Sequence, residues 1–142
     1  MKNTKPSATF VGSPNFNERP SGLEISAVVM HATVSGNMQG VVDWFNNPGA
    51  QASAHYTIDK NGAMVQHVSD YHRAWHAGES SWQGRPDLNS WSLGIELVNW
   101  NSGVDPYPES QYQASIALVA WMCEYYGINA NEFILAHYDV FF

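Results

Sequence analysis

Cysteine is almost absent from this sequence of 142 residues, and basic side chains are scarce. The single Cys123 excludes an intrachain disulfide, and its place on the apolar stripe of a helical pattern is typical of a buried thiol. Six Lys and Arg against 13 Asp and Glu give a formal net charge of −7. A chain so poor in positive charge is a weak candidate for nucleic acid or anionic lipid, so we expect neither as a partner.

Long apolar runs, internal repeats and low-complexity linkers are missing as well. No run approaches the roughly 20 residues of a membrane-spanning helix, so we expect no membrane span. Residues 1–9 carry two lysines without the apolar segment of a signal peptide. Two interpretations stay open: the protein acts where it is made, or an export signal has been removed from this chain. The length and a hydrophobic content of 44% predict a single globular domain over residues 1–142.

Strand and helix patterns alternate along the chain. The apolar run at 25–31 predicts a strand buried on both faces, and apolar spacing at 38–45 predicts an amphipathic helix. Two β-like runs, 53–59 and 63–68, flank an Asn-Gly pair and predict a hairpin. The aperiodic stretch 71–86 predicts a surface loop, and the polar stretch 15–22 predicts an ordered lead-in loop.

The second half continues the alternation. We expect a strand at 93–99, a long helix at 109–126 ended by Gly127, and a short strand at 133–136. Strands alternating with helices, together with one hairpin, predict an α/β domain with a mixed central sheet flanked by α-helices.

Three polar residues stand where apolar ones are expected. His31 ends the first buried strand, His137 follows the last one, and Glu96 lies mid-strand between Ile95 and Leu97. Each alone has a structural explanation, as a satisfied strand-end histidine or a solvated glutamate. Together they favour a hydrolytic zinc site at one edge of the sheet, because such sites combine about three protein ligands, a water and a nearby carboxylate.

The chain also resembles the type-2 N-acetylmuramoyl-L-alanine amidases, a family of bacterial wall-recycling amidases, phage amidase lysozymes and animal peptidoglycan recognition proteins. The resemblance runs from about Pro14 to Asp139. It rests on five segments in the family's order: Val-Val-Met-His31-Ala-Thr, Ser53-Ala-His-Tyr56-Thr-Ile-Asp, Ala74-Trp-His76-Ala-Gly, Ser92-Leu-Gly-Ile-Glu96-Leu-Val-Asn and Ala136-His137-Tyr-Asp139.

The resemblance implies roles for the matching positions. His31 and His137 correspond to histidine ligands of zinc, and Glu96 to the catalytic carboxylate that deprotonates the metal-bound water. Tyr56, Trp75 and His76 correspond to walls of the substrate groove, with His76 a candidate helper at the tetrahedral intermediate.

The other histidines match no such role. We expect His55 to be structural, and His67 and His72 to be surface residues.

The sequence departs from the family after His137. The family's loop there carries a third zinc ligand, an Asp or Cys, and usually a catalytic Lys, and this loop is missing here. Asp139 is the one acidic residue available as a stand-in, because on an extended segment it shares a face with His137. We therefore expect weak zinc binding and low activity.

Three hypotheses follow. The first is a zinc amidase that hydrolyses the bond between N-acetylmuramic acid and L-alanine in peptidoglycan. The second is a non-catalytic module that binds peptidoglycan or muropeptides, because the third ligand and the Lys are absent. The third is a folded but inert fragment. A cell-wall substrate implies periplasmic or extracellular action, and no protein partner is inferred.

Overall fold

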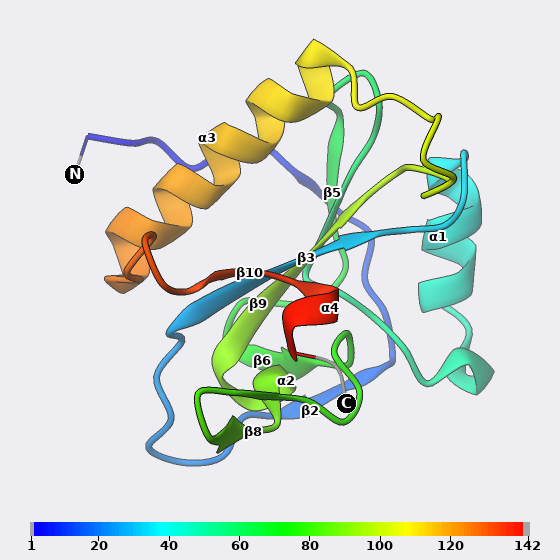
Figure 1. Ribbon diagram of the computed structural model, residues 1–142. Coiled ribbons are helices and arrows are strands. Elements are labelled where there is room, and N and C mark those ends of the chain that lie inside the picture. The colour runs from blue at the N-terminus through cyan, green and yellow to red at the C-terminus, as the bar shows by residue number, and fades with distance from the viewer. Residues whose placement is uncertain (1, 141–142) are drawn as a thin grey trace.

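A six-stranded sheet forms the centre of the fold in the computed structural model, which describes residues 2–140 (Figure 1). The strand order is β1-β5-β4-β9-β3-β10. β4, β9, β3 and β10 are parallel, whereas β5 runs antiparallel to β4, so the predicted mixed sheet is confirmed. The bounds are β1 (Thr9–Phe10), β3 (Ala27–Ala32), β4 (Tyr56–Ile58), β5 (Met64–Gln66), β9 (Ser92–Leu97) and β10 (Ile134–Ala136).

The long helix α3 (Glu109–Tyr126) covers one face of this sheet (Figure 1). It begins after Pro108 and ends at Gly127, whose φ of 68° is the left-handed conformation of a helix C-cap, as the sequence predicts. Leu118 and Met122 of the helix pack in one buried cluster with Val28 of β3 and other apolar side chains of the sheet. The larger of the two sheet cores therefore lies beneath α3.

Smaller elements cover the opposite face (Figure 1). The short helices α2 (Leu88–Trp91) and α4 (His137–Val140) contribute Leu88, Trp91 and Val140 to a second buried cluster. Ala27 and Val29 of β3 complete it from the sheet. Because β3 is apolar on both faces, it is buried between the two clusters, as its continuous hydrophobic run predicts.

Helix α1 (Met38–Phe45) lies at one end of the sheet and has the predicted bounds. Asn37 caps it by accepting a hydrogen bond from the backbone N–H of Gly40. Val41 and Phe45 pack against Ala54, and the 3₁₀ helix η1 (Pro48–Ala50) follows. One flank of α1 is therefore fixed to the segment that leads into β4.

The predicted hairpin joins β4 and β5. Its turn is closed by hydrogen bonds from Gly62 N to Asp59 O, and from Asp59 N to Ala63 O. Gly62 has a φ of 87°, and a Cβ there would lie 2.9 Å from the carbonyl oxygen of Ser110. Glycine is therefore required at this turn both by its backbone conformation and by the closeness of α3.

The predicted lead-in loop and the predicted surface loop both contain short strands. β2 (Phe16–Glu18) pairs with β6 (His72–Ala74), and β7 (Ser81–Trp82) pairs with β8 (Arg85–Pro86). The loop predictions were wrong here because strands of two or three residues are too short to show a period. In the part of the chain that the structure describes, no helix has the length and apolarity needed to cross a membrane.

Candidate active site

A row of polar residues crosses the central strands near their carboxyl ends. His31 of β3 is in register with Glu96 of β9, and Glu96 is in register with Thr57 of β4. Side chains in register on neighbouring strands point to the same face, here the face opposite α3. The carboxyl edge of parallel strands is the usual location of a site in an α/β sheet.

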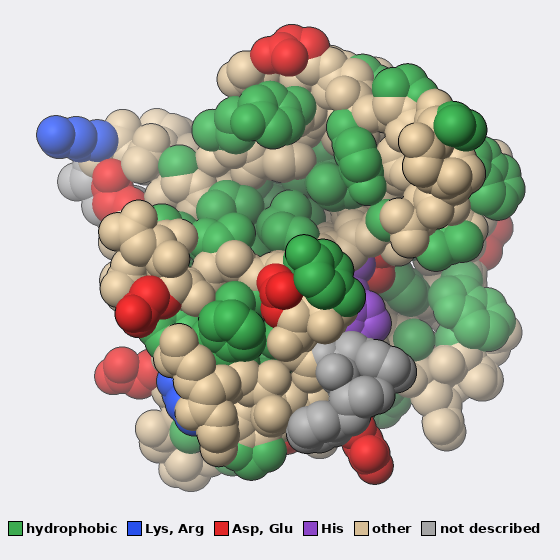
Figure 2. Space-filling model, viewed as in Figure 1, with side chains coloured by type: hydrophobic (Ala, Val, Ile, Leu, Met, Phe, Trp, Pro, Cys, Tyr) green, Lys and Arg blue, Asp and Glu red, His purple; other side chains and the backbone are tan. Residues whose placement is uncertain are grey.

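His137 extends this row beyond the sheet. Ala136 of β10 pairs with Met30, so the next residue, His137, lies beside His31 as the first residue of α4. The two ring centroids are 4.5 Å apart with an interplanar angle of 61°. Both side chains line a cavity of about 560 Å³. On the face drawn in Figure 2, histidine side chains are visible in a hollow near α4.

Glu96 is the unusual member of the row. Its Oε2 is buried and has no hydrogen-bond partner among the described residues. Burial raises the pKa of Glu96 to about 8, because the charged carboxylate loses its solvation. A buried carboxyl group without a partner costs free energy unless it holds a proton or lies near a cation. The environment of Glu96 is therefore that of a proton acceptor or a neighbour of a metal ion.

The two histidines suit a transition-metal ion. Burial, reinforced by His137, lowers the pKa of His31 to about 3, which keeps the ring neutral as metal ligation requires. Two imidazoles with an adjacent carboxylate are a donor set that zinc accepts. Within residues 2–140, however, no group of three or more His, Cys, Asp or Glu side chains is placed to hold a metal. The residues present fit part of a zinc site.

Asp139 does not complete the set. Its Oδ2 accepts a hydrogen bond of 2.9 Å from the backbone N–H of Ala136, and its backbone is helical. The prediction of a shared face with His137 assumed an extended segment, and α4 is not extended. The Asp139 carboxylate instead accepts a backbone hydrogen bond at the start of α4.

The structure contradicts the predicted groove position of Tyr56. The side chain is 0% exposed, packs in the cluster beneath α3, and donates a hydrogen bond to Asp70. Alternation along β4 explains the error, since Thr57 points to the site and Tyr56 must therefore point to the opposite face.

The prediction for His76 is wrong in a different way. The ring is buried behind His31 and bonded at both nitrogens, to His31 on one side and to Ser92 on the other. It does not line the cavities described at His31 and Glu96, and its hydrogen bond to His31 is its link to the site.

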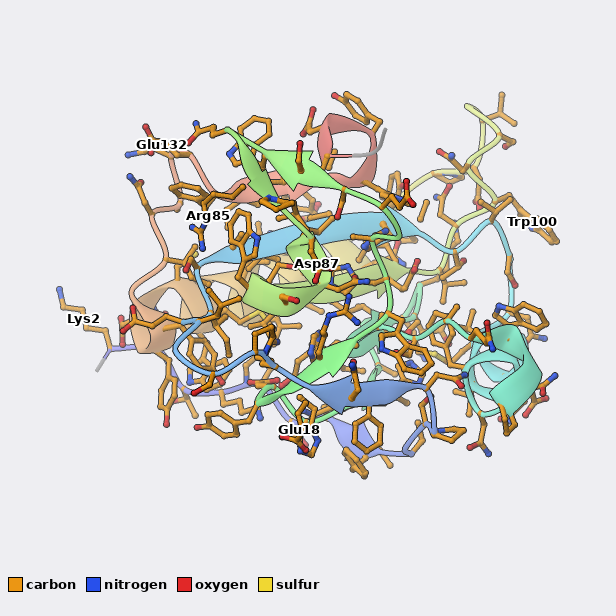
Figure 3. The ribbon with its side chains drawn as sticks, turned by 90° about the horizontal axis from the view of Figure 1, so that it is seen from below. Lys2, Glu18, Arg85, Asp87, Trp100 and Glu132 are labelled. Atoms are coloured by element: carbon orange, nitrogen blue, oxygen red, sulfur yellow. The ribbon has the colours of Figure 1, made fainter. Side chains whose placement is uncertain are left out.

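Trp75 lies in a separate cavity. It lines a space of about 670 Å³ with Arg73, Asp87 and other residues, none of which lines the cavities at His31 or Glu96. Its indole N–H donates to Asn17. In Figure 3, Asp87 marks this region near the middle of the view.

Two further histidines are buried. His55 is structural, as predicted, because its Nδ1 accepts the backbone N–H of Gly94 and its Nε2 bonds the carbonyl of His72. His67 is also buried, and its Nε2 bonds the hydroxyl of Thr57, so its predicted surface position was wrong.

Sequence reasoning missed the side chains that surround Glu96. A cavity of about 390 Å³ is lined by Glu96 together with Thr33, Val41 and Trp44, among others. Trp44 of helix α1 is 54% exposed although it is a large aromatic residue. A large aromatic residue on the outer flank of an amphipathic helix was the available signal. Trp100 projects at the same end of the molecule (Figure 3).

Comparison with known proteins identifies the family. A profile of the N-acetylmuramoyl-L-alanine amidases matches residues 21–141, a range that includes His31, Glu96 and His137. The chain belongs to the N-acetylmuramoyl-L-alanine amidase family. The resemblance predicted from five short segments is thereby confirmed, and the chain is placed among peptidoglycan amidases.

Relatives within this amidase family match most of the chain. The 1,6-anhydro-N-acetylmuramyl-L-alanine amidase AmpD of Escherichia coli (strain K12) is 41% identical over 152 residues, which cover 94% of this chain and 80% of that protein. AmpD of Haemophilus influenzae is 31% identical, with 92% of this chain and 79% of that protein covered.

Solved structures of the family share the fold. A crystal structure of a selenomethionine AmpD derivative matches with a TM-score of 0.84 at 29% identity, covering 99% of this chain and 88% of that one. AmiD of E. coli, in complex with the substrate anhydro-N-acetylmuramic acid-L-Ala-D-γ-Glu-L-Lys, matches with a TM-score of 0.70 at 28% identity. That match covers 89% of this chain and 58% of AmiD.

Proposed function

We propose that this chain is a zinc-dependent N-acetylmuramoyl-L-alanine amidase that hydrolyses the amide between N-acetylmuramic acid and L-alanine. The observation that carries the proposal is the His31–His137 pair, whose ring centroids are 4.5 Å apart, in the same row of side chains as Glu96, whose Oε2 is buried. Family membership and the muropeptide complex of AmiD support a peptidoglycan fragment as substrate.

His31 and His137 would hold the metal, each through one ring nitrogen. Bound zinc supplies Lewis acidity that polarises the scissile carbonyl and lowers the pKa of a water. His31 lies in β3 and His137 directly follows β10, which pairs with β3, so strand pairing brings the two rings together. Side chains positioned before substrate arrives favour catalysis.

Glu96 would act as the general base. Its carboxylate takes a proton from the attacking water and returns it to the amide nitrogen as L-alanine leaves. Desolvation makes this carboxylate a stronger proton acceptor than a solvated glutamate, with a pKa of about 8. A base of this strength is matched to catalysis near neutral pH.

Substrate would occupy the cavities on either side of the row. Trp44 stands in the cavity of Glu96, and Tyr107 and Tyr138 line the one at His31 and His137. Trp75 stays a predicted substrate contact in its own cavity, where Trp75→Ala is expected to weaken muropeptide binding and leave zinc content unchanged. Unaltered calorimetric titration by a muropeptide would remove Trp75 from the site.

A second function is a muropeptide-binding module without catalysis. It is favoured by one observation, that residues 2–140 place no third His, Cys, Asp or Glu with the two histidines. Such a module would use the same cavities and would not cleave the amide.

The two functions are separated by product analysis in ¹⁸O-labelled water. We expect an N-acetylmuramoyl-L-alanyl peptide to be split, with one ¹⁸O in the lactyl carboxylate of the sugar and none in the peptide. Binding of the intact muropeptide without cleavage, at saturating zinc, would instead establish the binding module. Glu96→Gln is the matched control, because it retains shape and removes the base.

A further inference from the structure

A chain of three buried hydrogen bonds runs behind His31. Nε2 of His31 lies 3.0 Å from Nδ1 of His76, and Nε2 of His76 lies 3.2 Å from Oγ of Ser92. The Ser92 hydroxyl in turn donates to the carbonyl oxygen of Leu88 at 2.5 Å. All four residues are buried, so no solvent competes for these bonds.

The direction of every bond follows from the carbonyl at its end. A carbonyl oxygen only accepts, so the single hydroxyl proton of Ser92 is donated to Leu88. The Ser92 oxygen must therefore accept a hydrogen bond from Nε2–H of His76. The ring of His76 is buried and both of its hydrogen-bond partners are uncharged groups, so the ring is neutral and, with its proton on Nε2, its Nδ1 is an acceptor. His31 therefore donates from Nε2–H, which leaves the lone pair on its Nδ1.

The opposite direction is unfavourable. If Ser92 donated to His76, the lone pairs of the serine oxygen and the Leu88 carbonyl would face each other at 2.5 Å with no proton between them. Two oxygen atoms with no proton between them repel each other at this distance, which is typical of an O–H···O hydrogen bond. The Leu88 carbonyl thus selects one tautomer for two histidines.

The position of His76 is fixed from two further sides. Its backbone N–H donates to Oδ1 of Asn89, as does that of Ala77, at 3.0 and 2.8 Å. Its ring lies over Gly94 of β9, where a Cβ would come within 2.4 Å of Cγ of His76. Gly94 is therefore glycine because the ring of His76 occupies the place of a side chain, and the ring has little freedom to turn away from His31.

We infer that His76 and Ser92 are positioning residues that fix the tautomer of His31, so that His31 binds the metal through Nδ1. This inference rests on the proposed zinc site. Histidine ligands commonly donate their second N–H to a carboxylate, a backbone carbonyl or water. Here the neutral ring of His76 is the acceptor for His31. The backbone carbonyl of Leu88 lies two hydrogen bonds further along the chain and fixes its direction.

The tautomer is measured first, on the metal-free chain, by long-range ¹H–¹⁵N NMR of the histidine rings, with His31 assigned by a His31→Asn variant. We expect His31 and His76 both to carry the proton on Nε2. In Ser92→Ala the anchor is lost, and we expect the Nδ1–H form of His76 to become populated. A wild-type His31 protonated on Nδ1 would overturn the inference.

Zinc affinity is measured next, by calorimetry with zinc alone. Loss of such a supporting partner typically weakens metal binding by roughly 10–100-fold, so we expect this loss in Ser92→Ala and its recovery in Ser92→Thr. Ser115→Ala is the control, since Ser115 is a buried serine of α3 whose hydroxyl bonds Gln111. Equal affinity in wild type, Ser92→Ala and Ser115→Ala would overturn the positioning role.

The two measurements also separate this inference from the proposed function. A wild type that shows the expected tautomers and binds no zinc would contradict the zinc site, and with it the metal-directed half of the inference. A wild type that binds zinc with His31 protonated on Nδ1 would leave the zinc site standing and overturn the role of His76 and Ser92.

Discussion

Glu96 is the residue on which the chemistry depends most. Its buried Oε2 is unpaired among the described residues, and its strand neighbours His31 and Thr57 flank it on the same face. The sequence showed that Glu96 was unusual, because a carboxylate rarely occupies the middle of an apolar strand. It could not show which strands would flank it, since register depends on long-range pairing.

Replacing this carboxylate should remove catalysis and leave the fold intact. We expect Glu96→Gln to lower kcat by roughly 10²–10⁴-fold, the usual contribution of a positioned general base. Zinc content should stay equal to wild type, because the amide replaces no histidine ligand. A rate within a few-fold of wild type, measured at saturating substrate, would show that Glu96 is structural.

The same residue predicts how stability depends on pH. The folded-state pKa of about 8 lies above the ordinary glutamate value of 4.5, so the folded chain holds the Glu96 proton more tightly than the unfolded chain. This contribution to stability is complete below about pH 4.5 and is lost as the pH rises to about 8. The Glu96→Gln variant should show no such pH-dependent loss of stability.

Melting temperatures measured in the presence of a chelator test this. The Tm of Glu96→Gln should exceed that of wild type by a margin that grows between about pH 5 and pH 8, then levels off. A margin that is constant from pH 5 to pH 9 would mean that Glu96 has an ordinary pKa in the folded chain.

Residue-level prediction failed where two faces of one strand had to be told apart. Tyr56 belongs to the same segment as Thr57, and the resemblance pointed to the segment as a whole. Only the pairing with β9 decides that Thr57 faces the site and Tyr56 faces α3. The prediction for His76 was wrong for a related reason, because the residues that contact its ring lie in β3 and β9, far away in sequence.

At the scale of elements, the long periodic segments were the predictable ones. The bounds of α1 and α3 agree with the sequence patterns, because amphipathic spacing and a glycine C-cap are local signals. The four short strands in the predicted loops were missed, since they are held by tertiary pairing. α4 was missed as well, and with it the orientation of Asp139.

Helix α1 carries the clearest substrate-binding prediction. Trp44 is half exposed and lines the cavity of Glu96, so Trp44→Ala should weaken muropeptide binding by roughly tenfold or more, as expected for an aromatic contact residue. The Tm should change little. Tyr112→Ala on α3 is the control, because Tyr112 is equally exposed and lies on the face opposite the site. Equal loss in both variants, by calorimetry, would place the ligand elsewhere.

For the whole molecule, the two apolar clusters hold the sheet independently of any metal. Both clusters are built from buried apolar side chains on the two faces of the sheet. We therefore expect chelator treatment to leave the circular dichroism spectrum intact and to lower Tm by only a few degrees, unlike a small domain that is unfolded without zinc. Loss of structure in the chelator would show that the metal is part of the fold.

The zinc dependence of turnover tests the central claim most directly. The measurement is the rate of N-acetylmuramoyl-L-alanyl peptide hydrolysis as zinc is titrated into the chelator-treated chain, for wild type and Glu96→Gln. We predict a wild-type rate that rises from zero and saturates only at high zinc concentration, because two histidines hold the metal weakly. Glu96→Gln should saturate at least about 10²-fold lower. Hydrolysis that is undiminished without zinc, or no hydrolysis at saturating zinc, would contradict the account.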